Sequence, residues 1–441
     1  MLKVLKFGGT SVGSAQRIKD LVKLTSNAEP KLVVLSAMSG TTNALVDICS
    51  SLYAKNSQEA IQKITDLNQK YKSEIELLFS KAASLKKAQE LLHTHFTYLH
   101  AFTQDLFTAN EEKAILAQGE LLSTALFHYY LEECGIASVL LPALNFMRID
   151  ANEEPDMPYI RKYLAEELAK YPGSVLYITQ GYICRNSFGE IDNLKRGGSD
   201  YTASIVGAAL NSPEIQIWTD IDGMHNNDPR IVNQTHPIKQ LSFDEAAELA
   251  YFGAKILHPT CILPAKKANI PVRLKNTMQP EAEGTTIANF QTADGVKAVA
   301  AKDGITAITI KSDRMLLAHG FLRAVFEIFE RYKTPIDMIC TSEVAVSLTI
   351  DNPKFLDKII TELREISQVE VDADQTIICI VGQLPKDQAG YAHHVLEALK
   401  DIPLRMVSYG GSSNNISVLV NANLKHKALQ ALNKGLFHYN A

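Results

Sequence analysis

Short uninterrupted runs of apolar residues recur along the chain. Several are bounded by Gly, Ser, Thr or Asp and are followed by stretches in which apolar residues have helical spacing. Apolar strands that alternate with helices are typical of a parallel sheet covered on both faces, so we expect an α/β domain. The predicted strands are Val4–Phe7, Leu32–Leu35, Val175–Ile178, Ile215–Trp218 and Pro271–Leu274.

One long segment, from Thr41 to Gln118, contains neither glycine nor proline. Apolar side chains recur in it every three or four residues, which is the period of an α-helix. These positions are Leu85, Ala88, Leu92, Phe96, Leu99, Phe102 and Leu106. The sequence therefore predicts a large helical insertion in one connection of the α/β domain, packed as a hairpin near the edge of the sheet.

The pattern changes after about residue 290, where short strands and helices follow one another. The predicted strands are Ile305–Ile310, Val344–Ile350, Thr376–Val381, Leu404–Ser408 and Ile416–Val420, and the predicted helices are Gly320–Arg331, Lys354–Ile366, Ala389–Leu399 and Lys425–Leu436. Two small ferredoxin-like β-α-β-β-α-β units fit this order, but the second is one strand short. A strand at 296–301 is the candidate for completing it, which would interleave the two units.

Length and composition agree with this division. A chain of 441 residues exceeds one ordinary core, and we expect domains at 1–292, 303–370 and 371–441. The net charge of −5 without charge blocks argues against nucleic acid or an anionic membrane as partner. No apolar run spans a membrane, and no signal peptide is expected. The six scattered cysteines suit a reducing cytoplasm.

Four segments carry candidate chemistry, and the first closes the first predicted strand. In Lys6-Phe7-Gly8-Gly9-Thr10-Ser11, glycines without a Cβ allow backbone N–H groups to approach phosphate oxygens. A helix that begins near Ser14 would add its positive N-terminal dipole. The spacing is neither that of Walker A nor that of the dinucleotide fingerprint. A purely structural Gly-Gly turn explains the same residues, so both interpretations stay open.

The second segment is Lys195-Arg196-Gly197-Gly198-Ser199-Asp200. The planar fork of Arg196 suits a carboxylate, and the glycines would expose backbone amides beside it. Asp200 stands where the predicted helix Thr202–Leu210 starts, a position that also suits a plain N-cap. A capped, charged loop is therefore the alternative.

The other two segments follow later strands. Trp218–Gly223, with Asp228–Arg230 downstream, puts carboxylates just past a strand end, where open α/β sheets bind ligands, although an Asp- and Gly-rich turn explains them too. In Phe252–Pro259, Lys255 could reach a nucleotide phosphate as a point charge. An ordinary surface lysine remains the alternative there.

Together these segments resemble the aspartokinases of the amino-acid kinase superfamily, over essentially the whole chain. The matching motifs occur in the family's order at Lys6–Ser11, Ser36–Asn43, Gln118–Glu120, Lys195–Asp200, Thr219–Gly223, Asp228–Arg230 and Gly253–Pro259. The resemblance implies ATP-dependent phosphorylation of the L-aspartate β-carboxylate, the first step of lysine, threonine and methionine biosynthesis. It also implies that Mg²⁺ enters as Mg-ATP, and it assigns no residue to a metal.

The resemblance implies roles for individual residues. Lys6 would stabilise the transferring phosphoryl group and Asp200 would orient Lys6, while Arg196 and Glu120 would hold the carboxylate and ammonium of aspartate. Further substrate contacts would be Ser36, Thr42, Gly197, Gly198 and Ser199. ATP contacts would be Lys6, Phe7, Gly8, Gly9, Thr219, Asp220, His225, Arg230, Lys255 and Ile256. Lys195 and His225 depart from the family's usual Gly and Tyr.

The two C-terminal units resemble ACT domains, which bind amino acids at their mutual interface. We expect lysine as the effector and a homodimer or dimer of dimers formed through these units. The implied effector residues are Met315, Ala318, Gly320, Phe321, Pro335, Ile336, Asp337, Ser342 and Glu343. A plain dimerisation module is the alternative, and whether threonine acts jointly stays open. No homoserine dehydrogenase is expected, because the chain ends at Ala441.

Two rival functions differ in class. One is another kinase of the superfamily, acting on glutamate, N-acetylglutamate or UMP; Glu120 with Arg196 and the paired ACT-like units favour aspartate instead. The other is a non-catalytic amino-acid-binding regulator. The intact set of Lys6, Arg196, Asp200 and Lys255 argues against it, because a regulator has no need of groups for phosphoryl transfer.

Overall fold

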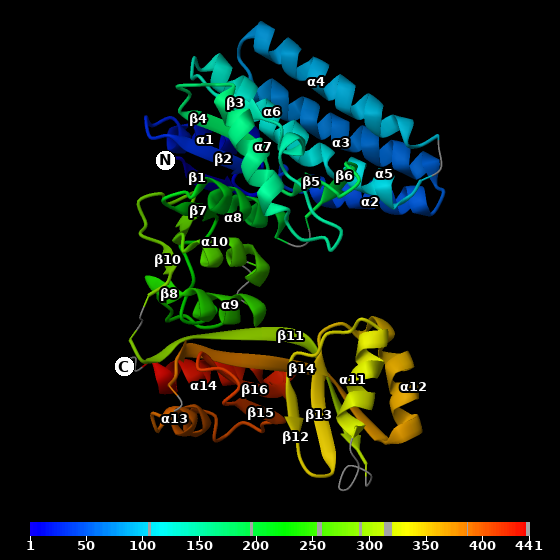
Figure 1. The fold of residues 1–441 in the computed structure, drawn as a ribbon, viewed down its shortest axis with the longest axis vertical. Helices are drawn as coiled ribbons and strands as arrows, with labels where there is room; N and C mark the ends of the chain where they lie inside the picture. The colour runs from blue at the N-terminus through cyan, green and yellow to red at the C-terminus, as the bar shows by residue number, and fades with distance from the viewer. Residues whose placement is uncertain are drawn as a thin grey trace. The chain divides into compact units, whose positions relative to one another are not determined.

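The structure, a computed structural model, describes residues 1–104, 107–194, 197–253, 258–290, 293–312, 320–385 and 387–437. The chain separates into two compact units, Met1–Gly223 with Ile256–Phe290, and Met224–Lys255 with Gln291–Ala441 (Figure 1). Each unit is built around one main sheet. Within the described ranges, no helix is both long and apolar enough to cross a membrane.

The N-terminal unit is built on the predicted parallel sheet. Its strands lie in the order β3 (Val139–Leu141), β4 (Leu176–Gln180), β2 (Lys31–Leu35), β1 (Lys3–Phe7), β7 (Ile215–Thr219), β9 (Val272–Asn276) and β10 (Thr285–Ala288). Neighbours from β3 to β9 are parallel, and β10 is antiparallel to β9. The carboxyl ends of these parallel strands therefore meet at one edge, where such sheets bind ligands.

Helices surround this sheet, and a group of them forms the predicted insertion. The helices of the unit are α1 (Ala15–Thr25), α2 (Thr41–Tyr53), α3 (Ser57–Leu78), α4 (Ala82–Ala101), α5 (Ala109–Leu116), α6 (Gln118–Glu133), α7 (Met157–Ala169), α8 (Gly198–Leu210) and α10 (Leu263–Ala268). The long helices α3 and α4 run side by side as the expected hairpin (Figure 1). One continuous core joins them to the sheet, since Leu5 and Val33 belong to the same apolar cluster as Tyr71 and Phe96.

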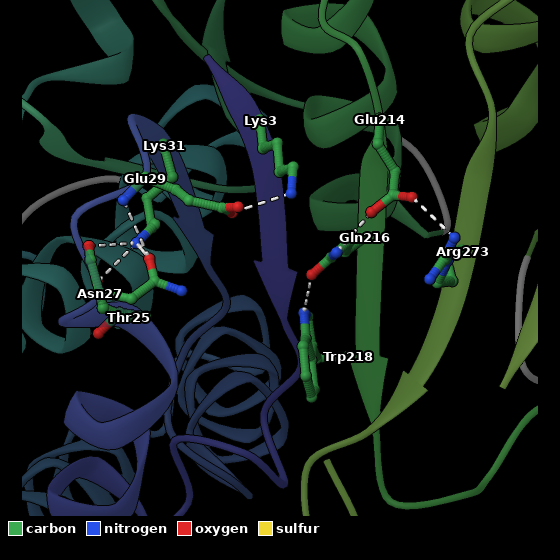
Figure 2. A network of polar contacts seen from close by, with 9 residues as sticks. All are labelled: Lys3, Thr25, Asn27, Glu29, Lys31, Glu214, Gln216, Trp218 and Arg273. Atoms are coloured by element: carbon green, nitrogen blue, oxygen red, sulfur yellow. Dashed lines mark hydrogen bonds and ion pairs between the residues drawn. The ribbon is translucent and has the colours of Figure 1, made fainter. Parts of the chain in front are cut away.

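Polar contacts tie the amino ends of the central strands to their neighbours (Figure 2). The fully buried Lys31 donates to the backbone oxygens of Thr25, the last residue of α1 (3.1 Å), and of Asn27, just past the helix (2.8 Å). The last carbonyls of a helix have no partner within it, so Lys31 supplies one. Burial lowers the pKa of Lys31. On β7, Gln216 accepts from the indole N–H of Trp218 (3.0 Å). These contacts fix α1 against β2 and orient the Trp218 ring.

The C-terminal unit contains the ferredoxin-like elements. Its sheet has the order β12 (Ile339–Thr341), β13 (Ala345–Ile350), β11 (Gly295–Lys311), β14 (Gln368–Gln383), β16 (Asn415–Asn421) and β15 (Met406–Tyr409), all antiparallel. Its helices are α11 (Phe321–Arg331), α12 (Leu356–Ile366), α13 (Tyr391–Ala398) and α14 (Lys425–Leu436). Two separate apolar clusters fill it, one with α11 and α12 and one with α13 and α14.

The expected extra strand at 296–301 forms, but it is not a separate element. It is the first half of β11, which continues without a break into the strand predicted at Ile305–Ile310. Residues 295–302 pair with residues 377–383 of β14, Ile305 pairs with Gln375, and residues 307–311 pair with residues 368–372. The two ferredoxin-like units therefore share two long strands in one sheet, with register shifts in β11 between Lys302 and Ala307.

The segment Met224–Lys255, expected in the first domain, is grouped with the C-terminal compact unit. It contains β8 (Gln240–Ser242) and α9 (Phe243–Tyr251), and it belongs to the C-terminal unit. Polar contacts explain this. Glu245 of α9 pairs with Lys297 of β11 at 2.9 Å, and Glu248 accepts a hydrogen bond from Asn415 at 2.6 Å.

Candidate active site

A pocket of about 620 Å³ opens at the carboxyl ends of β1, β2 and β7 in the N-terminal unit. The predicted residues that line it are Lys6, Gly9, Ser36, Thr42, Glu120, Gly197, Gly198, Ser199, Asp200, Thr219 and Asp220. The structure thus brings together segments from five separate parts of the sequence. Its place matches the rule for ligand sites in open α/β sheets.

A buried ion pair stands at the centre of this pocket. Lys6, at the end of β1, lies 2.7 Å from a carboxylate oxygen of Asp200, in the first turn of α8. Lys6 is 9% exposed. Asp200 also gains from the positive end of the α8 dipole. The pair is neutral overall, but it fixes the Lys6 ammonium at the carboxyl edge of the sheet, where the ammonium could contact a phosphate group.

Close packing at the start of α8 explains both of its glycines. Gly197 has φ +73, and a Cβ there would come within 2.6 Å of the Cys261 sulfur. A Cβ on Gly198 would come within 2.5 Å of the Tyr182 ring. Any larger residue would push the helix start, and Asp200 with it, away from Lys6.

Glu120, near the start of α6, is a carboxylate with one free oxygen inside the pocket. It is 3% exposed, and Oε1 accepts from the backbone N–H of Ala37 at 3.1 Å. Oε2 has no partner among the described groups. Burial raises the pKa of Glu120 to about 8, because its effect exceeds that of the Ala37 hydrogen bond, which lowers the pKa. A cationic group binding at Oε2 would stabilise the ionised form.

The glycine loop after β1 fits the phosphate prediction only in part. A Cβ on Gly9 would lie 3.1 Å from the Ala37 carbonyl oxygen, so the loop packs tightly on the β2–α2 loop. The Gly8 N–H is already used, because it donates to the Trp218 carbonyl at 3.3 Å. Phe7 is fully buried and stacks on Trp218 with ring centroids 5.6 Å apart. Its side chain is a core group rather than a ligand contact.

Several predicted nucleotide residues do not line this pocket. His225 and Arg230 belong to the other compact unit. The Arg230 guanidinium makes a two-bond ion pair with Asp228, at 2.9 and 2.7 Å, and is largely exposed. Lys195, Arg196, Lys255 and Ile256 lie outside the described residues.

The structure also adds pocket residues that the sequence did not single out. They are Thr10, Ala37, Met38, Ser39, Gly40, Asn43, Tyr182 and Leu194. Most stand within two motifs already recognised, where only selected positions were assigned. Tyr182 had no signal in the sequence. It adopts a left-handed backbone conformation (φ +68), and its backbone N–H donates to the Thr202 hydroxyl at 3.0 Å, which fixes its backbone beside α8.

The predicted effector residues fall in the C-terminal unit, where Met315 and Ala318 lie outside the described residues. Gly320 (φ +96) caps α11, Phe321 begins it, and Ile336 packs on the same apolar cluster. Pro335, Ser342 and Glu343 are exposed.

Asp337, expected to bind an effector ammonium, is already paired with a cation of the protein. Its side chain is only 1% exposed and pairs with Lys302 at 2.9 Å. It also accepts from the Tyr251 hydroxyl at 2.7 Å. Lys302 has a second partner, Asp351, at 2.8 Å. Both contacts of Asp337 use Oδ1, whereas Oδ2 is buried and has no hydrogen-bond partner among the described groups, so Asp337 keeps one acceptor that an effector ammonium could use.

Comparison with known proteins identifies relatives of the whole chain. The family model described as the amino acid kinase family matches residues 1–276, and an ACT domain model matches residues 378–436. Lysine-sensitive aspartokinase 3 of Escherichia coli (strain K12) is 33% identical over 98% of this chain and 99% of that protein.

Solved structures agree. The crystal structure of E. coli aspartokinase III in complex with aspartate and ADP, in the R-state, has a TM-score of 0.84 and 32% identity, and covers 99% of this chain and all (100%) of that one. The structure of the same protein with lysine and aspartate, in the T-state, has a TM-score of 0.82, with the same identity and coverage. The chain therefore belongs to the amino acid kinase family and, within it, to the aspartokinases.

The raised pKa of Glu120 predicts how stability depends on pH without ligand. Between about pH 4.5 and 8 the folded protein keeps a proton that the unfolded chain has released, so stability falls as pH rises through this window. Glu120→Gln removes this pH-dependent loss of stability, because glutamine does not ionise. Its melting temperature should exceed that of the wild type by several degrees at pH 8, and by much less near pH 5.

Glu133, on the same helix, is the matched control. Burial raises its pKa, but hydrogen bonds from Ser80 and Lys81 outweigh burial and leave the pKa lowered. Glu133→Gln should therefore destabilise at neutral pH, and its effect should shrink at acid pH. A Glu120→Gln difference that stays constant from pH 5 to 8 would contradict the assignment.

Proposed function

We propose that this protein transfers the γ-phosphoryl group of ATP to the side-chain carboxylate of L-aspartate, giving 4-phospho-L-aspartate and ADP. This is the first step of lysine, threonine and methionine biosynthesis. The observation that carries the proposal is a single pocket that holds the Lys6–Asp200 pair and the half-satisfied Glu120 carboxylate. The full-length similarity to aspartokinases supports it.

The reaction needs positioning and charge neutralisation more than covalent chemistry from the protein. An oxygen of the substrate β-carboxylate, already ionised near pH 7, attacks the γ-phosphorus, and the bond to the β-phosphate oxygen breaks. Lys6 would neutralise charge on the transferring group. Asp200 would keep the Lys6 ammonium in place. No strong general base is required.

The protein would select aspartate by binding its ammonium group and its carboxylate at separate residues. The free Oε2 of Glu120 suits the ammonium group, and binding there would satisfy a buried acceptor. Arg196 would bind a carboxylate through two parallel hydrogen bonds. Ser36, Thr42 and the first turn of α8 (Gly197–Ser199) would complete the aspartate site.

The nucleotide would use the Gly9 side of the pocket together with Thr219 and Asp220. Phe7 and Gly8 would shape the backbone of the loop and would not contact the nucleotide through side chains. The remaining proposed nucleotide contacts are His225, Arg230, Lys255 and Ile256. Mg²⁺ would enter as Mg-ATP, to neutralise phosphate charge. Magnesium needs only one or two protein carboxylates beside phosphate oxygens, which Asp200 and Asp220 offer. In the described parts of the chain, no larger cluster of metal ligands occurs.

Lysine is the proposed effector, acting through the C-terminal unit. The E. coli relative is named lysine-sensitive, and one of its structures contains lysine. A lysine ammonium would bind Asp337 at its unpartnered Oδ2 and would compete with Lys302 for this carboxylate. Lys302 would keep Asp351 as its partner, so the competition leaves no buried charge unpaired. Gly320, Phe321, Ser342 and Glu343 would form the rest of the site.

Assembly and location are also proposals. Large apolar side chains on the two edge strands of the C-terminal sheet, Ile339 on β12 and Val407 and Tyr409 on β15, are exposed. They support a homodimer or dimer of dimers formed through this unit. The six cysteines are free thiols, which supports a location in the reducing cytoplasm.

The direct test is an ATP-dependent hydroxamate assay with aspartate, glutamate and UMP as alternative acceptors. We expect turnover with aspartate alone. Lys6→Ala should abolish turnover and leave aspartate binding measurable by calorimetry, because Lys6 acts on the transferring group. Turnover with another acceptor, or near-normal kcat in Lys6→Ala, would refute the proposal.

Arg196→Ala should chiefly raise the KM for aspartate. The loss of a charge-assisted contact to a carboxylate costs about 1.5–3 kcal/mol, which is roughly 10- to 150-fold. Steady-state kinetics with each substrate varied in turn will measure it. A rise confined to the KM for ATP would move Arg196 to the nucleotide side.

Asp337→Asn should weaken inhibition by lysine, requiring roughly 5- to 150-fold more lysine for half-inhibition. Activity without lysine should hardly change, because Tyr251 can still donate to the amide oxygen and Lys302 keeps Asp351. Asp351→Asn is the matched control, since it removes the other partner of Lys302 and should leave the sensitivity unchanged. Equal effects of the two variants would mean that the cluster is only structural.

A further inference from the structure

The helical insertion reaches the active site through one helix. Three neighbouring residues of α3, Lys70, Tyr71 and Glu74, form hydrogen bonds with the two loops that build the pocket or with the first helical residue after each loop. None of the three is among the residues that line the pocket. Their spacing puts them on adjoining positions of the helix surface, so one rigid element contacts both loops.

Two of these contacts hold the β2–α2 loop. Lys70 Nζ donates to the carbonyl oxygen of Ser39 at 2.6 Å. The Tyr71 hydroxyl lies 3.0 Å from the Thr41 hydroxyl, and Tyr71 is fully buried. Between them stands Gly40, whose left-handed conformation (φ +78) turns the loop into α2. Ser39 and Gly40 both line the pocket, so these bonds set the position of its wall.

The third contact holds the glycine loop. A Glu74 carboxylate oxygen accepts from the backbone N–H of Ala15 at 2.6 Å. Ala15 is the first residue of α1, where backbone N–H groups lack partners within the helix and negative charge is favoured. The loop from Gly8 to Ser14 is therefore anchored to β1 at one end and to α3 at the other.

The two loops also touch each other, since a Cβ on Gly9 would lie 3.1 Å from the Ala37 carbonyl oxygen. A shift of either loop would change the spacing between the groups that face ATP and those that face aspartate. Phosphoryl transfer is sensitive to such shifts, because a displacement of about 1 Å can cost on the order of 100-fold in rate.

We propose that Lys70, Tyr71 and Glu74 are positioning residues, through which α3 holds the glycine loop and the β2–α2 loop at the spacing that phosphoryl transfer requires. This inference rests on the proposed function for its kinetic consequences. The geometric part, that α3 orders the two loops, stands independently of the substrate.

The test compares variants that remove each bond with variants that retain it. Lys70→Met removes the side-chain donor, whereas Lys70→Arg retains a donor. Glu74→Met removes the side-chain acceptor, whereas Glu74→Gln retains an acceptor. Tyr71→Phe removes only the hydroxyl. Lys63→Met is the matched control, because Lys63 lies two turns earlier on α3 and bonds Ser51 of α2 at 2.8 Å instead of a pocket loop.

Lys70→Met and Tyr71→Phe should raise the KM for aspartate, and Glu74→Met should raise the KM for ATP or lower kcat, each on the order of 10- to 100-fold. Lys70→Arg and Glu74→Gln should recover most of the loss, and Lys63→Met should match the wild type. Hydrogen exchange should become faster at residues 36–43 in Lys70→Met and at residues 8–15 in Glu74→Met.

A purely structural role predicts equal losses of melting temperature in all variants, Lys63→Met included, with unchanged KM values. That result, or unchanged exchange in both loops, would overturn the proposal. A wild type without aspartate-dependent turnover would instead refute the proposed function. The exchange measurement would still decide whether α3 orders the loops.

Discussion

The ion pair between Lys6 and Asp200 is the constraint around which the catalytic unit is arranged. Either charge left alone in this partly buried position would carry a large desolvation cost, so the end of β1 and the start of α8 must meet. That meeting is possible only because Gly197 and Gly198 leave room for neighbouring side chains. The resulting site presents a fixed ammonium at the carboxyl edge of a parallel sheet.

Beside this pair the pocket contains a buried acidic group, Glu120, that has no cationic partner among the described residues. The ammonium group of a zwitterionic substrate would supply one. Glu120 is buried with one oxygen bonded and the other free, and its raised pKa expresses the cost of ionising it without a cation. A substrate ammonium would remove that cost. Binding energy would therefore depend on the charge pattern of the substrate as much as on its size, which is consistent with selection among small carboxylate acceptors.

In the C-terminal unit the comparable constraint is the pair of long strands β11 and β14. They run through both ferredoxin-like halves, so the halves share backbone hydrogen bonds instead of contacting only through side chains. Lys302 lies where the register of β11 shifts, and it bonds two carboxylates from one half. A cation that competes for one of them would change the contacts of Lys302 at the point where the two halves join. A small ligand bound there could therefore affect both halves.

The sequence by itself determined the local elements and the chemistry of the motifs. Apolar runs predicted the parallel strands, and the segment without glycine or proline predicted the helical insertion. Both features depend on neighbouring positions along the chain. The resemblance to family motifs predicted Lys6, Glu120 and Asp200 as site residues. Tertiary structure decided what depends on distant partners: the merging of two strands into β11, the attachment of Met224–Lys255 to the C-terminal unit, and the pairing of Asp337 with Lys302. Tyr182 and the three α3 residues gave no local signal, because a hydrogen bond to a loop dozens of residues away leaves no periodicity in the sequence.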